Sequence, residues 1–136
     1  MPVRRKKAAS SRKQAGPRGR VAAGDRALKA RVWVETGGRP ALTDDGADLL
    51  DQIDACGSLS EAARRLHFSY RRAWMLVDAM NHRWPTPVVE TATGGVRGGG
   101  AQLTEVGRHV LRTFRDLQLR LEHLLDEAGD PFDPLP

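Results

Sequence analysis

The clearest hydrophobic pattern lies near the C-terminal end of the chain. Apolar side chains recur there at spacings of four, three, four and three residues, at Val110, Phe114, Leu117, Leu121 and Leu124. This spacing is the heptad seam of helices that pair. It predicts one long helix from about Glu105 to Glu127, which spans roughly 35 Å at a rise of about 1.5 Å per residue. One small domain cannot cover such a stripe, so we expect a partner helix.

Two shorter helices are predicted upstream, and both carry capping signals. The first covers residues 41–56, where Thr43 is placed to cap the N-terminus and Gly57 to end the helix. The second begins after Ser58, which forms a capping box with Glu61 three residues later. Its inward side consists of Leu59, Ala62, Ala63 and Leu66. Its outward side carries two arginines, Arg64 and Arg65.

A third helix is predicted from about Tyr70 to His82, after a tight break in which Ser69 is the N-cap. Its apolar side, expected in the core, consists of Ala73, Trp74, Val77 and Met80. The opposite side carries Arg71, Arg72, Met75, Asp78 and His82. Cations in a first helical turn are unfavourable for the helix dipole, so we expect Arg71 and Arg72 to have another role. That role is to contact guanine edges or phosphates. Simple solvation of both arginines is the alternative.

Short strands flank these helices. Residues 28–35 alternate apolar and polar positions and predict a strand that ends in the turn at 36–40. Residues 87–91 and 100–103 predict two more strands, joined as a hairpin by a glycine-rich loop. Two helices around a tight turn, followed by a hairpin, predict a winged helix-turn-helix. The fold class is mainly α with a small β wing, and the helix from Tyr70 is the recognition helix.

The loop TGGVRGGG, residues 93–100, is the predicted tip of the wing. Its glycines allow the backbone to approach a duplex closely, and Arg97 is placed to reach phosphate or a narrow minor groove. A nucleotide phosphate loop does not fit. No Lys-Ser or Lys-Thr pair follows the glycines, and the loop leads into a strand instead of opening a helix.

Charge is arranged in blocks that the overall net charge of +5 conceals. Residues 1–20 carry +8, and the remaining 116 residues carry −3. Within that remainder, residues 57–108 carry +3, whereas residues 39–56 carry −4 and residues 109–136 carry −3. A basic segment between acidic neighbours indicates a polyanion partner for one face. An ordinary solvated surface is the alternative.

Several other classes of protein fit poorly. The single cysteine, Cys56, excludes an internal disulfide framework and suits the cytosol, and no apolar run is long enough for a transmembrane helix. The basic N-terminus has no apolar core behind it, so it is not a secretory signal. The four histidines, at positions 67, 82, 109 and 123, show no metal-ligand spacing. We therefore expect a cytoplasmic protein that is not an enzyme and has no cofactor, metal site or membrane partner.

Two stretches together resemble a known family. GSLSEAARRLHFSYRRAWMLVDAMN (57–81) and VVETATGGVRGGGAQLTEVG (88–107) resemble the N-terminal DNA-binding domain of the ModE family of molybdate-responsive transcription regulators. The resemblance covers about residues 28–125. It implies a LysR-like winged helix-turn-helix, and a homodimer that binds a palindromic operator and regulates transcription linked to molybdenum metabolism. Matched positions are Ser69, Tyr70, Arg71 and Arg72 at the start of the recognition helix, and Arg97 in the wing.

The chain also departs from that family. The molybdate-binding modules expected after the long helix are absent, so we expect no molybdate binding by this chain. Residues 1–27 form a predicted disordered basic tail, for DNA affinity or for solubility, residues 28–127 the DNA-binding domain, and residues 128–136 a C-terminal tail. A protein-interaction module on the same scaffold and a nonspecific architectural DNA-binding protein are the alternatives.

Overall fold

The computed structural model describes residues 26–92 and 100–136, which belong to two compact units. The larger unit, residues 28–129, contains the helices and strands of the described residues. The smaller unit includes residues 26, 27 and 130–136, and within it Arg26 Nε donates a hydrogen bond to Asp130 Oδ2 at 2.9 Å. The larger unit therefore holds the whole candidate site that can be described.

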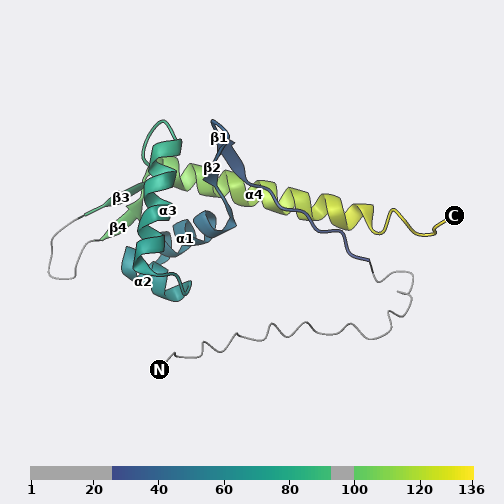
Figure 1. Cartoon of the computed structure of the whole chain (residues 1–136), viewed down its shortest axis with the longest axis horizontal. Coiled ribbons are helices and arrows are strands. Elements are labelled where there is room, and N and C mark those ends of the chain that lie inside the picture. The colour runs from purple at the N-terminus through teal and green to yellow at the C-terminus, as the bar shows by residue number, and fades with distance from the viewer. Residues whose placement is uncertain (1–25, 93–99) are drawn as a thin grey trace, which may run out of the picture. The chain divides into compact units, whose positions relative to one another are not determined.

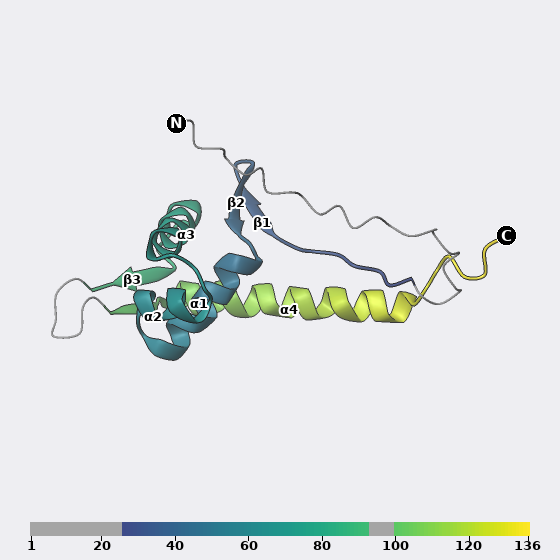
Figure 2. The same cartoon turned by 60° about the horizontal axis from the view of Figure 1, so that its bottom comes forward.

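Four helices and two short hairpins form the larger unit (Figure 1). Along the chain they are β1 Val34–Thr36, β2 Arg39–Leu42, α1 Asp44–Cys56, α2 Leu59–Arg65, α3 Tyr70–Arg83, β3 Val89–Thr91, β4 Ala101–Leu103 and α4 Glu105–Ala128. The first three helices and both hairpins gather around the first half of α4, and the second half of α4 extends beyond them (Figure 2). The predicted class, mainly α with a small β wing, is confirmed. Within the described ranges, no helix is long and apolar enough to cross a membrane.

The caps predicted from the sequence are present. An N-cap hydroxyl accepts a hydrogen bond from the amide three residues later in all four helices: Thr43 from Gly46, Ser58 from Glu61, Ser69 from Arg72 and Thr104 from Gly107. Gly57 ends α1 with φ of 67°, a conformation that favours glycine. These signals are local, which is why the helix boundaries follow them closely.

A core of apolar side chains joins the three short helices, the wing strands and the first half of α4. From α3 it receives Ala73, Val77 and Met80, as predicted. Trp74 is the exception, because 46% of its surface is exposed. It lies one helical turn after Tyr70, and the side chains at i and i+4 share a face. The prediction that Trp74 is a core residue was therefore wrong.

The first hairpin also differs from the prediction. Strand β1 contains only residues 34–36, whereas the alternating pattern predicted a strand over residues 28–35. Residues 39–42, interpreted as a turn and the start of a helix, form the partner strand β2. Alternation alone predicts a strand only where a partner exists, and β2 lies opposite residues 34–36.

The second hairpin agrees with its prediction. Strands β3 and β4 pair antiparallel with Glu90 opposite Gln102. The chain at Gly57 and Ser58 forms an isolated bridge beside this hairpin, in which the Ala101 amide donates to the Gly57 carbonyl at 3.0 Å. The loop of residues 93–99, with Arg97, lies outside the described residues. The described part is therefore the base of the wing.

Candidate nucleic-acid interface

The turn between α2 and α3 is held by backbone hydrogen bonds. The Phe68 amide donates to the Ala63 carbonyl at 2.9 Å, and His67 adopts a φ of 57°. On both sides of the turn the helices bury alanines, Ala62 and Ala63 in α2 and Ala73 in α3. Small buried residues allow the two helices to approach closely. This is the helix-turn-helix arrangement, and it leaves the outer side of α3 uncovered.

The outer side of α3 presents large side chains to solvent. Tyr70, Trp74 and Met75 are 56%, 46% and 61% exposed, and Arg71 is exposed beside them. Tyr70 and Trp74 are one turn apart, as are Arg71 and Met75, so the four form one surface. A soluble domain rarely exposes several large apolar groups together without a binding partner. This surface combines a cation with apolar and aromatic contacts, which suits the edges of base pairs.

Arg72 is placed differently from its neighbour Arg71. Its guanidinium forms an ion pair with the carboxylate of Asp45, in the first turn of α1. It also lies over the ring of Phe68, 4.2 Å from the centroid. Arg71 has no carboxylate partner in residues 26–92 and 100–136. Of the two arginines predicted to contact DNA, one is therefore engaged within the domain.

The two arginines of α2 share one carboxylate. Arg64 Nη2 lies 2.6 Å from Glu61 Oε1, and Arg65 Nε lies 3.3 Å from the same atom. The hydrogen bond from Arg64 holds the pKa of Glu61 below its ordinary value, and Glu61 in turn raises the pKa of Arg64. The predicted capping box is thus half formed. Ser58 caps the helix, while the Glu61 side chain binds the arginines.

The base of the wing is tied to α3 by Asn81. Its Oδ1 accepts from the amides of Val88 and Val89 at 2.9 and 3.1 Å, and its Nδ2 donates to the Val89 carbonyl at 3.0 Å. On the other side, Thr104 Oγ1 donates to the Pro87 carbonyl at 2.7 Å. Gly107 of α4 lies against the backbone of Val88. The Asn81 contacts fix the start of β3 relative to α3, and the Thr104 and Gly107 contacts fix it relative to α4.

The predicted dimerisation residues of α4 fall into two groups. Val110 and Phe114 are buried in this chain's own core, because the first half of α4 packs on α1 and the wing strands. In this structure both side chains are therefore already covered within the chain itself. Leu117 and Leu124 are 42% and 61% exposed, and Leu121 is half-buried. The uncovered part of the stripe thus begins at Leu117.

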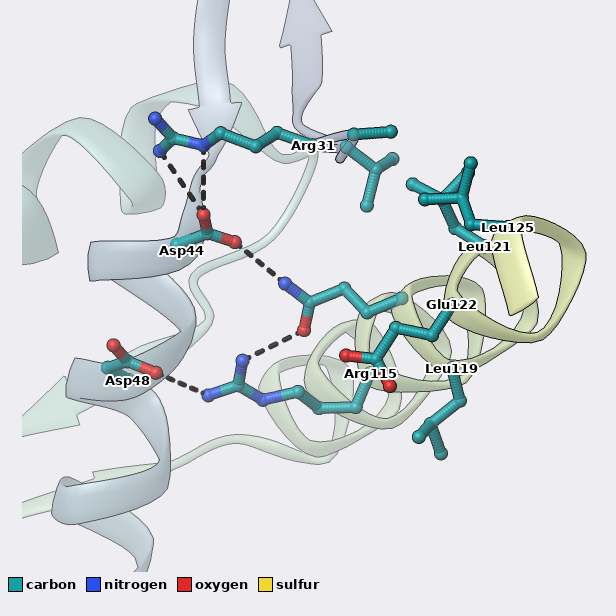
Figure 3. A pocket seen from close by; sticks show the side chains of 11 residues that line it. Arg31, Asp44, Asp48, Arg115, Leu119, Leu121, Glu122 and Leu125 are labelled. Atoms are coloured by element: carbon teal, nitrogen blue, oxygen red, sulfur yellow. Dashed lines mark hydrogen bonds and ion pairs between the residues drawn. The ribbon is translucent and has the colours of Figure 1, made fainter. Parts of the chain in front are cut away.

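Helix α4 is fastened to α1 by a polar network (Figure 3). Arg115 Nη2 donates to Asp48 at 2.7 Å, Arg115 Nε to Asp51 at 3.0 Å, and Gln118 Nε2 to Asp44 at 2.7 Å. Burial lowers the pKa of Arg115, but the hydrogen bonds to Asp48 and Asp51 outweigh it, so the net shift is upward. A hollow of about 550 Å³ adjoins this network, lined by residues 30–32 and by Leu121 and Leu125.

Three residues of the candidate nucleic-acid interface were not predicted from the sequence. Trp74 was assigned to the core, although its spacing from Tyr70 places it on the exposed face. Glu61 was assigned only to a cap, although spacings of three and four residues from Arg64 and Arg65 favour ion pairs on a helix. No sequence pattern indicated that Asp45 pairs with Arg72, because 27 residues separate the two. In the part of the chain that is described, no cluster of His, Cys, Asp and Glu could hold a metal ion.

Comparison with known proteins identifies relatives of this chain. No protein-family model matches it. ModE of Azotobacter vinelandii, named a molybdenum transport protein, is 37% identical over 101 residues, which are 74% of this chain and 37% of that protein. The transcriptional regulator ModE of Haemophilus influenzae is 38% identical over 90 residues, 64% of this chain and 35% of that one. The DNA-binding transcriptional dual regulator ModE of Escherichia coli is 35% identical over 88 residues, 65% and 33% of the two chains.

The resemblance to ModE regulators inferred from the sequence is therefore confirmed. The chain spans about a third of the length of these curated relatives. Among solved structures, Streptococcus pneumoniae FabT in complex with DNA is 15% identical, with a TM-score of 0.48 over 66% of this chain and 64% of that one.

Proposed function

We propose that this chain is a sequence-specific DNA-binding regulator of transcription. The observation that carries the proposal is the exposed face of α3, where Arg71 lies beside Tyr70, Trp74 and Met75 on the second helix of a helix-turn-helix. Arginine recognises guanine through two hydrogen bonds, and apolar side chains contact the thymine methyl group. The relatives named as transcriptional regulators support the same function.

In this proposal α3 enters the major groove and the other elements position it. Ser69 and Tyr70, at the start of the helix, are suited to contact phosphate, because hydroxyl groups and helix N-termini are common phosphate donors. The wing, including Arg97, follows the adjacent backbone or minor groove. The hydrogen bonds of Asn81 keep the base of the wing at a fixed distance from α3. The base contacts of α3 and the backbone contacts of the wing are thereby kept at a fixed spacing along the DNA.

The proposed active form is a homodimer on a palindromic operator in the cytoplasm. Support comes from the leucines exposed on α4 beyond the domain core, at positions 117 and 124. A two-fold dimer presents two recognition helices about 34 Å apart, one turn of DNA. The genes under control are proposed to concern molybdenum, because relatives carry that element in their names.

Selection from a library of random DNA duplexes tests the proposal. We expect enrichment of a palindromic consensus, bound about 10³-fold or more tightly than random duplex at physiological salt. Enrichment of DNA without a consensus would instead identify an architectural DNA-binding protein. A failure to enrich DNA at low salt, with the folded state verified by circular dichroism, would favour a protein-interaction module.

A further inference from the structure

Arg71 and Arg72 are adjacent and both exposed, but their surroundings give them different roles. The guanidinium of Arg72 is paired with Asp45 on one edge and covered by the Phe68 ring on one face. A planar guanidinium held in both ways has a fixed orientation, since stacking and ion pairing each restrict its rotation. Its Cα belongs to the first turn of α3, and its partner belongs to the first turn of α1.

Electrostatics at the helix termini favour this pairing. A cation in the first turn of α3 faces the positive end of the helix dipole, whereas a carboxylate in the first turn of α1 is favourably placed. The Asp45 carboxylate offsets the unfavourable position of Arg72. An exposed ion pair by itself stabilises a fold little. Its main effect here is geometric, because it connects the first turns of two helices that are otherwise packed through their apolar faces.

Arg71 lacks both restraints within the part of the chain described here. Neither a carboxylate nor an aromatic ring holds its guanidinium in that part, and Met75 follows it by one turn on the exposed face. The unfavourable position of its charge at the N-terminus of α3 is therefore not offset locally. This is the arrangement expected of a side chain whose partner is supplied by a ligand.

We propose that Arg72 is a positioning residue, which with Asp45 and Phe68 orients the first turn of α3, and that Arg71 reads the bases. The proposal rests on the proposed function, since it divides the work of the DNA-reading helix between two neighbours. It assigns sequence discrimination to Asp45 as well, although this acidic residue lies on α1 and would repel DNA if it acted through charge alone.

The substitution Asp45→Asn distinguishes positioning from direct reading, because the two roles change the ratio of affinities for selected over random duplex in opposite directions. If Arg72 reads DNA and Asp45 merely competes with it, releasing Arg72 raises the ratio of affinities for selected over random duplex. If the pair positions α3, the ratio of affinities for selected over random duplex falls, by roughly tenfold for neighbours that are coupled. Arg72→Ala is expected to lower the ratio equally, and the double variant to lower it no further. Measurements are made by fluorescence anisotropy at fixed salt, well below the unfolding temperature.

Arg71→Ala is the matched comparison at the adjacent position. We expect it to weaken binding of the selected duplex about 10- to 100-fold and to relax the consensus at one base pair. Arg72→Lys keeps the charge but not the planar, stacked geometry, and is expected to behave like Arg72→Ala. A higher ratio of affinities for selected over random duplex in Asp45→Asn, or a relaxed consensus at one position with Arg72→Ala, would overturn the proposal.

Amide hydrogen exchange keeps this inference distinct from the proposed function. Asp45→Asn and Arg72→Ala are expected to accelerate exchange of the amides of residues 73–76 by the same factor, while Arg71→Ala leaves them unchanged. Unchanged rates in the first two variants would refute positioning even if a consensus is selected. If the wild-type chain selects no consensus but the rates change as expected, the DNA function fails and the positioning of α3 by Arg72 stands.

Discussion

At the scale of single residues, Glu61 pairs with the positive charges on α2 that the proposed DNA complex would use. Its carboxylate binds Arg64 and Arg65, so it competes with phosphate for both arginines in the proposed complex. We predict that Glu61→Gln strengthens binding to random duplex. The slope of log affinity against log salt becomes steeper by about 0.9 for each phosphate newly neutralised, and by about twice that at most for two arginines.

The control for this prediction is Glu127→Gln, the same change of charge at the C-terminal end of α4. Equal effects of the two substitutions would mean that only net charge matters. The arginines hold the pKa of Glu61 low, so the pairing is complete above the ordinary carboxyl pKa and is lost as the pH falls through the lowered value. The difference between wild type and Glu61→Gln should therefore be constant between about pH 6 and 8, where Glu61 stays ionised.

At the scale of elements, the close packing of α4 against the wing requires a glycine at position 107. A Cβ at Gly107 would lie 2.0 Å from the Val88 carbonyl oxygen, a backbone atom that cannot move without shifting β3. We predict that Gly107→Ala destabilises the domain by about 1–3 kcal/mol, as overpacking does, despite the better helix propensity of alanine. For a domain of about 100 residues each kcal/mol lowers the unfolding temperature by about 4–8 °C, which calorimetry measures.

Two other glycines provide graded controls. At Gly46 an added Cβ would lie 3.2 Å from the Met80 sulfur, the end of a flexible side chain, and at Gly100 it would lie 3.6 Å from the Gly57 carbonyl oxygen. Gly46→Ala gains helix propensity of about 1 kcal/mol against small displacements of Met80 and of Leu42, whose Cδ1 would lie 3.3 Å away, so its net effect should be near zero. Gly100→Ala should also change little. If Gly107→Ala is no worse than these two, the close approach of α4 to β3 is not required.

The elements also show what could be predicted from the sequence. Helix ends were predicted well, because an N-cap such as Ser69 acts within three residues of its own position. The β1–β2 hairpin was not, because strand pairing depends on which segments meet in space. The same limit applies to the site. The exposed start of α3 was predicted, whereas the pairing of Arg72 with Asp45 requires α1 and α3 to be placed first.

At the scale of the whole domain, α4 divides into a buried half and an uncovered half. Val110 and Phe114 complete the core, and Arg115 then binds α1 through Asp48 and Asp51. Beyond this point the apolar stripe is covered only in part, because Leu121 is half-buried whereas Leu117 and Leu124 are exposed. The Arg115 contacts fix the direction in which that uncovered half leaves the domain. In a dimer, the same contacts would determine the separation of the two recognition helices.

The uncovered stripe predicts the oligomeric state. We expect Leu117→Asp to convert the proposed homodimer to a monomer in sedimentation equilibrium, because a carboxylate cannot be buried unpaired in a helix seam. Affinity for a duplex with two half-sites should then fall by about 10²–10⁴, the avidity that linking two modules provides, while affinity for one half-site is retained. Leu119→Asp is the matched control, since Leu119 is similarly exposed on α4 but lies off the stripe. Dimers that survive Leu117→Asp, or dissociate equally with Leu119→Asp, would place the interface elsewhere on the domain.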